Sequence, residues 1–262
     1  MKIILPLIGV TLPLLAAGSV LAAGLSVPAA TAAKPAQLWG QVMTSLYGPY
    51  DKKRKCWIGT SDDGQMCMRP HKLATQNVDG VDRMFLVMAG KGVAGEDCHA
   101  CTGSVGFAVL DRVGDNFVQS AISDLYLELG GWGDPPGEEA FSVRQLGPKE
   151  YGWVIESGYT GQGYTFGGAD IFAPDAGKVK ELGMVSTYFS DCGARADGEA
   201  CEEHDYDISF DTAGAGRYFD IVLLPSPDAK KPAKVDRFVV PFDAGTGQYA
   251  EPAELKKLLM AE

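Results

Sequence analysis

Most of this 262-residue chain alternates short strand-like segments with turn residues, and this alternation is what most constrains its fold. The clearest case is residues 205–211. There Tyr206, Ile208 and Phe210 would face one side while aspartate and serine face the other, as in a half-buried strand. Glycine, proline or aspartate follows where the chain must reverse. Five such units predict strands at 205–211 and 218–224, 105–110 and 117–122, 141–146 and 151–155, 164–172 and 179–189, and 238–242 and 248–249.

These units predict an all-β fold, mainly antiparallel hairpins in a meander, with a short helix near each end. The helices are expected at residues 37–47 and 252–260, where leucines recur at helical spacing. The hairpins follow one another at about 25–35 residues, which suggests a loose repeat. A propeller-like ring and a sandwich would both limit exposed sheet edges, so both remain open. No strand alternates with a long helix, which disfavours a parallel α/β sheet.

The first 22 residues have the features of a secretory signal peptide. Lys2 precedes an apolar run that ends in the small residues Ala22 and Ala23, as a signal-peptidase site requires. We expect a flexible leader at residues 23–37, rich in alanine and proline, and a single disulfide-containing β domain at 38–262. The protein would then be exported, to a periplasm or the extracellular space. No later stretch is long and apolar enough to span a bilayer, so no membrane insertion is expected after cleavage.

The cysteines suit an oxidising compartment, because they are even in number and fall in three sequence-local pairs. Each pair flanks a short or turn-rich segment, so locality favours bonds within the pairs. Short loops of this kind contribute about 2–3 kcal/mol each, chiefly by holding the loop. The cysteines expected to form structural disulfides are Cys56 with Cys67, Cys98 with Cys101, and Cys192 with Cys201.

The group from Cys98 to Cys101 has chemical alternatives. A c-type haem site would need histidine directly after the second cysteine, and Thr102 stands there instead. Zinc binding would compete with oxidation outside the cytosol. A thiol–disulfide oxidoreductase would place its first cysteine at a helix N-terminus, whereas turn and strand residues follow here. His99 could still stabilise a cysteine thiolate, so a thiol–disulfide oxidoreductase remains the alternative to a structural disulfide at Cys98 and Cys101.

Two glycine-rich segments with aromatic residues, 130–137 and 156–168, are the candidates for ligand binding. Glycine lets the backbone approach a ligand closely, and tyrosine or tryptophan offers a flat apolar face with a polar tip. The competing interpretation is that these glycines serve tight turns and bulged strands. The ligand-binding candidates are Trp132, Glu156, Tyr159, Gln162 and Tyr164.

Charge and motifs narrow the function classes. The formal net charge of −11 disfavours nucleic acid and anionic lipid as partners. The acidic run at residues 199–211 lacks the spacing of a calcium loop and is expected to be a solvated strand face, with no metal. Gly-x-Ser-x-Gly is absent and histidines are few, so no catalytic residue and no cofactor is assigned.

The sequence therefore favours an exported, non-catalytic binding or envelope-interaction protein of an inhibitor-like kind. Its partner would be a protein, a peptide or a saccharide. Two enzymatic alternatives remain: a thiol–disulfide oxidoreductase using Cys98 and Cys101, and a hydrolase whose dispersed residues meet only in the folded chain.

Overall fold

The computed structural model describes residues 24–62, 64–94, 101–197, 199–231 and 234–259. Strands make up 54% of it and helices 13%, which confirms the predicted all-β class. The elements in chain order are β1 (Ser26–Pro28), α1 (Ala29–Ala32), α2 (Pro35–Tyr47), β2 (Tyr50–Asp51), β3 (Cys56–Ser61), β4 (Gly64–Val78), β5 (Val81–Gly92), β6 (Gly103–Val113), β7 (Asn116–Ile122), β8 (Leu127–Leu129), η1 (Glu138–Ala140), β9 (Phe141–Gln145), β10 (Tyr151–Gly161), β11 (Tyr164–Asp175), β12 (Lys178–Ser190), η2 (Cys192–Ala194), β13 (Glu203–Phe210), β14 (Ile221–Pro225), β15 (Phe238–Val240), β16 (Phe242–Asp243), β17 (Gln248–Tyr249) and α3 (Ala253–Leu259).

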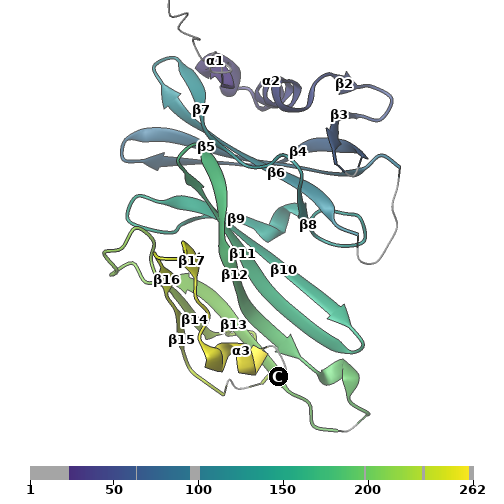
Figure 1. Ribbon diagram of the computed structural model, residues 1–262, viewed down its shortest axis with the longest axis vertical. Helices are drawn as coiled ribbons and strands as arrows, with labels where there is room; N and C mark the ends of the chain where they lie inside the picture. Colours follow the sequence, from purple (N-terminus) through teal and green to yellow (C-terminus); the bar gives the residue numbers. More distant parts are fainter. Residues whose placement is uncertain (1–23, 63, 95–100, 198, 232–233, 260–262) are drawn as a thin grey trace, which may run out of the picture.

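The strands form stacked layers. Figure 1 shows α1 and α2 at one end, then the β4–β7 strands, then β9–β12, and finally β13–β15 with α3 at the other end. One continuous path of hydrogen-bonded strands runs from β15 through β12 and β7 to β2. The step between β12 and β7 is a parallel contact of Lys178 with Ile122. This arrangement corresponds to the sandwich-like alternative, because sheet faces pack on one another, and not to a propeller ring.

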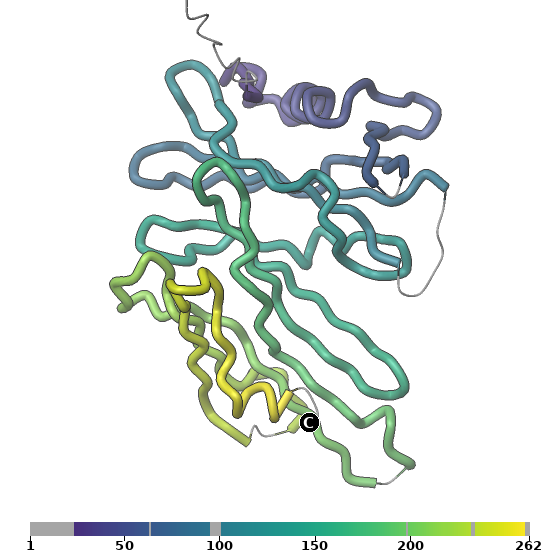
Figure 2. Tube along the Cα trace, in the orientation of Figure 1, coloured from purple at the N-terminus to yellow at the C-terminus, as the bar shows by residue number. Residues whose placement is uncertain are grey.

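Three apolar cores lie between these layers. The first packs α2 residues such as Leu38 and Val42 against Leu86 and Leu110 of the upper sheet. The second lies on the opposite face of the same strands, where β5 and β6 meet Trp153 of β10. The third core joins β10–β12 to the C-terminal strands and α3. Figure 2 traces the chain through these segments. Successive side chains of β5 and β6 therefore enter different cores, and both faces of these strands are buried.

Four of the five predicted strand–turn–strand units are confirmed as antiparallel pairs: β6–β7, β9–β10, β11–β12 and β13–β14. The fifth differs because the expected strand at 238–242 divides at Pro241, which has no backbone N–H for a ladder. Its first part, β15, pairs with β14, and its second part, β16, pairs with β17. The helices expected near the two ends are present as α2 and α3.

The segment expected to be a flexible leader carries regular structure from Ser26 onward, as β1, α1 and the start of α2. Strand β1 pairs with β7, and Val27 is completely buried. The backbone N–H of Ala29 also donates to the Asp115 carbonyl at 2.8 Å. A strand this short shows no alternation that a sequence can display, and its partner lies about ninety residues away. Residues 1–22, the expected signal peptide, lie outside the described residues.

Two of the three expected disulfides are present. Cys56 is bonded to Cys67 across the β3–β4 hairpin, and Cys192 to Cys201 across the loop that contains η2. Cys98 lies outside the described residues, so its bond to Cys101 stays a prediction. None of the helices in the described ranges has the length and apolar character to cross a membrane.

Placing a charge on the buried face of β1 tests whether the leader belongs to the fold. Val27→Asp should lower the free energy of unfolding by at least about 3 kcal/mol, because an aspartate there would lie in a dry core without a partner. Ser26→Asp is the matched control, since Ser26 is exposed on the same strand. Urea unfolding of both variants measures the difference. Equal stability of the two would show that β1 does not pair with β7 in solution.

Candidate ligand-binding groove

A groove of about 1030 Å³ lies between the loop that follows β8 and the β10–β11 hairpin. The end of β8 contributes residues 128–129, the loop contributes residues 130–132 and 134–137, and β10 contributes residues 156–160. Strand β11 contributes residues 166–168 and Asp170. The lining is completed by Met184 and Ser186 of β12, Leu259 of α3, Thr102 and Ala140. Sequence segments that are far apart thus meet here, because the layered fold places β8, β10, β12 and α3 around one concave surface.

Trp132 lies at the tip of a tight turn in the groove wall. Gly131 and Asp134 exchange backbone hydrogen bonds of 3.1 Å in both directions, which leaves Trp132 and Gly133 as the two turn residues. Both have positive φ, 58° for Trp132 and 76° for Gly133, as a type I′ turn requires. Glycine adopts this conformation freely, but a bulky aromatic residue does so at a cost of about 1 kcal/mol or more. The strained backbone presents an indole that is 62% exposed.

Close backbone contacts fix this loop on the sheet. A Cβ atom at Gly103 of β6 would lie 2.1 Å from the Pro135 nitrogen, so only glycine permits the loop to lie this near the strand. The Gly133 N–H donates to the Cys101 carbonyl at 2.8 Å, and Lys91 forms an ion pair with Asp134 at 2.8 Å. The loop therefore holds the indole at a defined place.

The opposite wall is the end of the β10–β11 hairpin. The sequence suggested a glycine-rich loop at 156–168, whereas the structure continues both strands to a two-residue turn at Gln162 and Gly163, with φ of 53° and 85°. The ring of Tyr159 lies over Gly161, because a Cβ atom there would meet the tyrosine hydroxyl at 2.3 Å. Glycine in this strand thus makes room for an aromatic ring. Gly163 in turn contacts the backbone of Gly193 in η2.

The groove is acidic. Glu128, Asp134, Glu156 and Asp170 all contribute to its lining, and no lysine or arginine does so among the described residues. Lys91 offsets the charge of Asp134. Burial raises the pKa of Asp170, and the negative charge of Glu181 raises it further, while a hydrogen bond from Ser157 acts in the opposite direction. The site thus has negative potential beside aromatic rings.

The structure brings together three of the five residues proposed from the sequence. Trp132, Glu156 and Tyr159 line the groove, although Trp132 is separated from the other two by β9 and the first half of β10. Gln162 and Tyr164 lie at the hairpin turn and are not in the lining. The sequence analysis did not select Asp170. Its position as the acidic residue within the mainly apolar stretch 166–173 could have indicated it. Nothing in the sequence pattern pointed to Leu259.

Of the residues that the two enzymatic alternatives would use, the structure describes Cys101, His71 and His204. Cys101 is followed by strand β6 and not by a helix, so no helix dipole is directed at it from that side. His71 packs edge-on against Phe141 with ring centroids 5.1 Å apart, and His204 is buried beside Phe189. Neither histidine lines the groove. His99 lies outside the described residues.

Comparisons with protein-family models, with curated proteins and with solved structures gave no match.

Replacing the strained tryptophan tests whether its conformation serves stability. Trp132→Asn should leave the free energy of unfolding unchanged or raise it by up to about 1 kcal/mol, because asparagine tolerates positive φ and little buried area is lost. Tyr50→Asn is the comparison: Tyr50 has no positive φ and its ring packs edge-on against Trp57, so this variant should lose stability. Chemical denaturation measures both. A loss above about 1 kcal/mol for the Trp132 variant would mean that the indole is a packing residue.

The pKa of Asp170 predicts a pH-dependent stability. A carboxyl whose pKa is raised in the folded state contributes stability below the unfolded pKa and loses it as pH rises through the folded value. Asp170→Asn cannot ionise, so its stability relative to the parent chain should increase as pH rises from about 4 and then level off.

Asp175 on the same strand supplies a control of opposite sign. Hydrogen bonds from Lys180, at 2.5 Å, and from Arg217, at 3.0 Å, lower its pKa. Asp175→Asn should therefore be less stable than the parent at neutral pH, and this deficit should disappear as pH falls through the lowered pKa. Thermal unfolding across the pH range distinguishes the two. Parallel pH curves for both variants would contradict the assignment.

Proposed function

We propose that this chain is an exported, non-catalytic binding protein whose groove holds an extended, basic segment of a partner polypeptide. The observation that carries the proposal is the lining of the groove: carboxylates with no lysine or arginine beside them among the residues that the structure describes, next to the exposed rings of Trp132 and Tyr159. Lysine and arginine side chains bind such a surface through ion pairs and through the faces of aromatic rings.

The edge of β10 supports an extended ligand. Strand β9 pairs with β10 only as far as Ile155, opposite Phe141. Beyond that point the strand pairing of β10 within the described ranges is with β11 alone. Glu156 to Gly158 therefore present a strand edge inside the groove, and such an edge can accept main-chain hydrogen bonds from a peptide that adds as a further strand.

The charge of the site favours a peptide over a saccharide among the partners that the sequence left open. A sugar would also stack on tryptophan and tyrosine and could donate hydroxyl hydrogen bonds to the carboxylates, but it carries no positive charge to offset theirs. A basic segment gains from Glu128, Glu156 and Asp170 together. Disulfides such as Cys56–Cys67 support export, because they persist in oxidising compartments. A role as an inhibitor or an envelope-interaction module fits the same groove.

Calorimetric titration with defined probes tests the proposal. A short peptide of alternating lysine and valine should bind, whereas the same peptide with glutamate in place of lysine, and a neutral β-1,4-linked glucose oligomer, should not. Glu156→Gln should weaken binding of the basic peptide by about tenfold, the loss expected for one charge-assisted contact. Binding should also weaken as salt is added.

Gln162→Ala and Tyr164→Phe are the matched controls, because both residues lie on the same hairpin but outside the groove lining. Both variants should bind like the parent chain. Tight binding of the glucose oligomer, or equal binding of the basic and acidic peptides, would overturn the proposed ligand class.

A further inference from the structure

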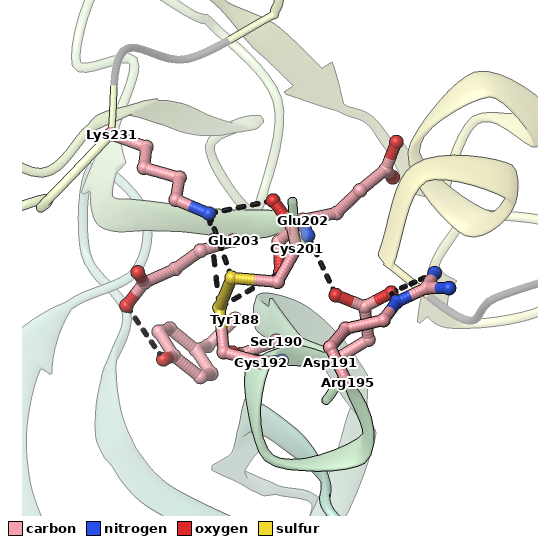
Figure 3. The surroundings of a disulfide bond; sticks show 9 residues. All are labelled: Tyr188, Ser190, Asp191, Cys192, Arg195, Cys201, Glu202, Glu203 and Lys231. Atoms are coloured by element: carbon pink, nitrogen blue, oxygen red, sulfur yellow. Dashed lines mark hydrogen bonds and ion pairs between the residues drawn. A yellow bond between two sulfur atoms is a disulfide. The ribbon is translucent and has the colours of Figure 1, made fainter. Parts of the chain in front are cut away.

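The disulfide between Cys192 and Cys201 has a cation against its sulfur atoms. The Lys231 ammonium lies 2.8 Å from the Cys201 Sγ and 3.8 Å from the Cys192 Sγ. The Cys201 carbonyl accepts a hydrogen bond of 2.6 Å from the same ammonium and so holds it in place. Figure 3 shows Lys231 reaching the bond from one side, with Asp191 and Arg195 on the other.

The carboxylates around this disulfide are engaged elsewhere. Asp191 is bound by Arg195 and accepts a hydrogen bond from the Glu202 N–H, and both contacts lower its pKa. Glu202 pairs with Lys234 at 2.7 Å. Glu203 accepts a hydrogen bond of 2.9 Å from the Tyr188 hydroxyl, so three acidic groups have partners of their own (Figure 3).

Lys231 itself has no ion pair with a carboxylate among the described residues. The ion pairs there join other lysines and arginines to acidic side chains, and Lys231 is directed at the disulfide and at a carbonyl. Its positive charge is therefore available to a negative charge that develops on sulfur. A thiolate leaves a disulfide faster when a neighbouring cation stabilises it.

We propose that Cys192–Cys201 is a thiol-reactive disulfide that exchanges with dithiol reductants, with Cys192 as the sulfur that is attacked and Cys201 as the leaving group held by Lys231. Both cysteines are partly exposed, and the residues from Gly193 to Asp197 that follow Cys192 are exposed. Lys231 lies closer to Cys201 than to Cys192, so the stabilised charge is on Cys201.

The exchange balances in two steps. A thiolate of the dithiol attacks the Cys192 Sγ, the bond between Cys192 and Cys201 breaks, and its electron pair leaves with Cys201 as a thiolate. The second thiol of the reductant then loses its proton and attacks the mixed disulfide, which releases Cys192. The reductant ends as a disulfide, and the two cysteines have gained two electrons and two protons.

The second described disulfide provides an internal comparison. Cys56 is completely buried and Cys67 is 8% exposed, so an attacking thiolate must first open the β3–β4 hairpin. We expect this bond to react as a structural disulfide.

The experiment is a timed reduction of the oxidised full chain with limiting dithiothreitol, followed by acid quenching, alkylation and peptide mapping. Cys192–Cys201 should open at least about tenfold faster than Cys56–Cys67. Lys231→Met should slow the opening of Cys192–Cys201 by about tenfold, while Lys231→Arg should retain most of the rate. Lys230→Met, at an exposed neighbouring lysine, should react like the parent chain.

A monothiol probe identifies the attacked sulfur. Brief treatment with glutathione should leave the adduct on Cys192 and a free Cys201 that alkylates. Damage to the loop by Lys231→Met would expose the bond and speed its reduction, so a slower rate reports the lost charge and not misfolding. An adduct on Cys201, equal rates for the two disulfides, or an unchanged or faster rate in Lys231→Met would overturn the proposal.

Discussion

The structure depends on burying both faces of β5 and β6. Leu86 and Met88 pack under α2, whereas Phe85 and Val87 on the same strand pack against the β9–β11 layer. Burying such side chains contributes about 1.5–3 kcal/mol each, and a strand with one wet face would gain only half of this. The two coverings are therefore required together. Helices α1 and α2 and strand β1 cover the first core, so burial of that face of β5 and β6 depends on them.

This layering creates the groove as a consequence. The upper sheet carries β8 and its turn, and the lower layer carries the β10–β11 hairpin (Figure 1). The groove is lined from both of these parts. Two glycines allow close packing here: the absence of a side chain at Gly103 lets the loop lie against β6, and its absence at Gly161 leaves room for the ring of Tyr159. The aromatic walls are thus placed by close backbone contacts.

Charge is distributed unevenly between the two candidate sites. The groove is lined by several carboxylates, and among them Asp134 forms an ion pair with Lys91. Around Cys192–Cys201 each described carboxylate has a partner, and Lys231 contacts the sulfur atoms instead. The two sites are also neighbours in the fold, because Gly193 beside Cys192 contacts Gly163 at the hairpin tip. The sequence favoured structural roles for all the cysteines. That role is retained for Cys56–Cys67, and the position of Lys231 is the reason to distinguish Cys192–Cys201.

The sequence by itself determined what depends on near neighbours: the alternation of strands and turns, the terminal helices, and the pairing of Cys56 with Cys67 and Cys192 with Cys201. Each follows from side-chain periodicity, turn chemistry or short loop closure. Only the tertiary structure decided that β1 joins β7, that the layers stack as a sandwich, and that Trp132 lies in one groove with Tyr159 while Gln162 does not. These outcomes depend on contacts between residues far apart in the chain. A local sequence pattern shows that a face is apolar but not which distant segment packs against that face.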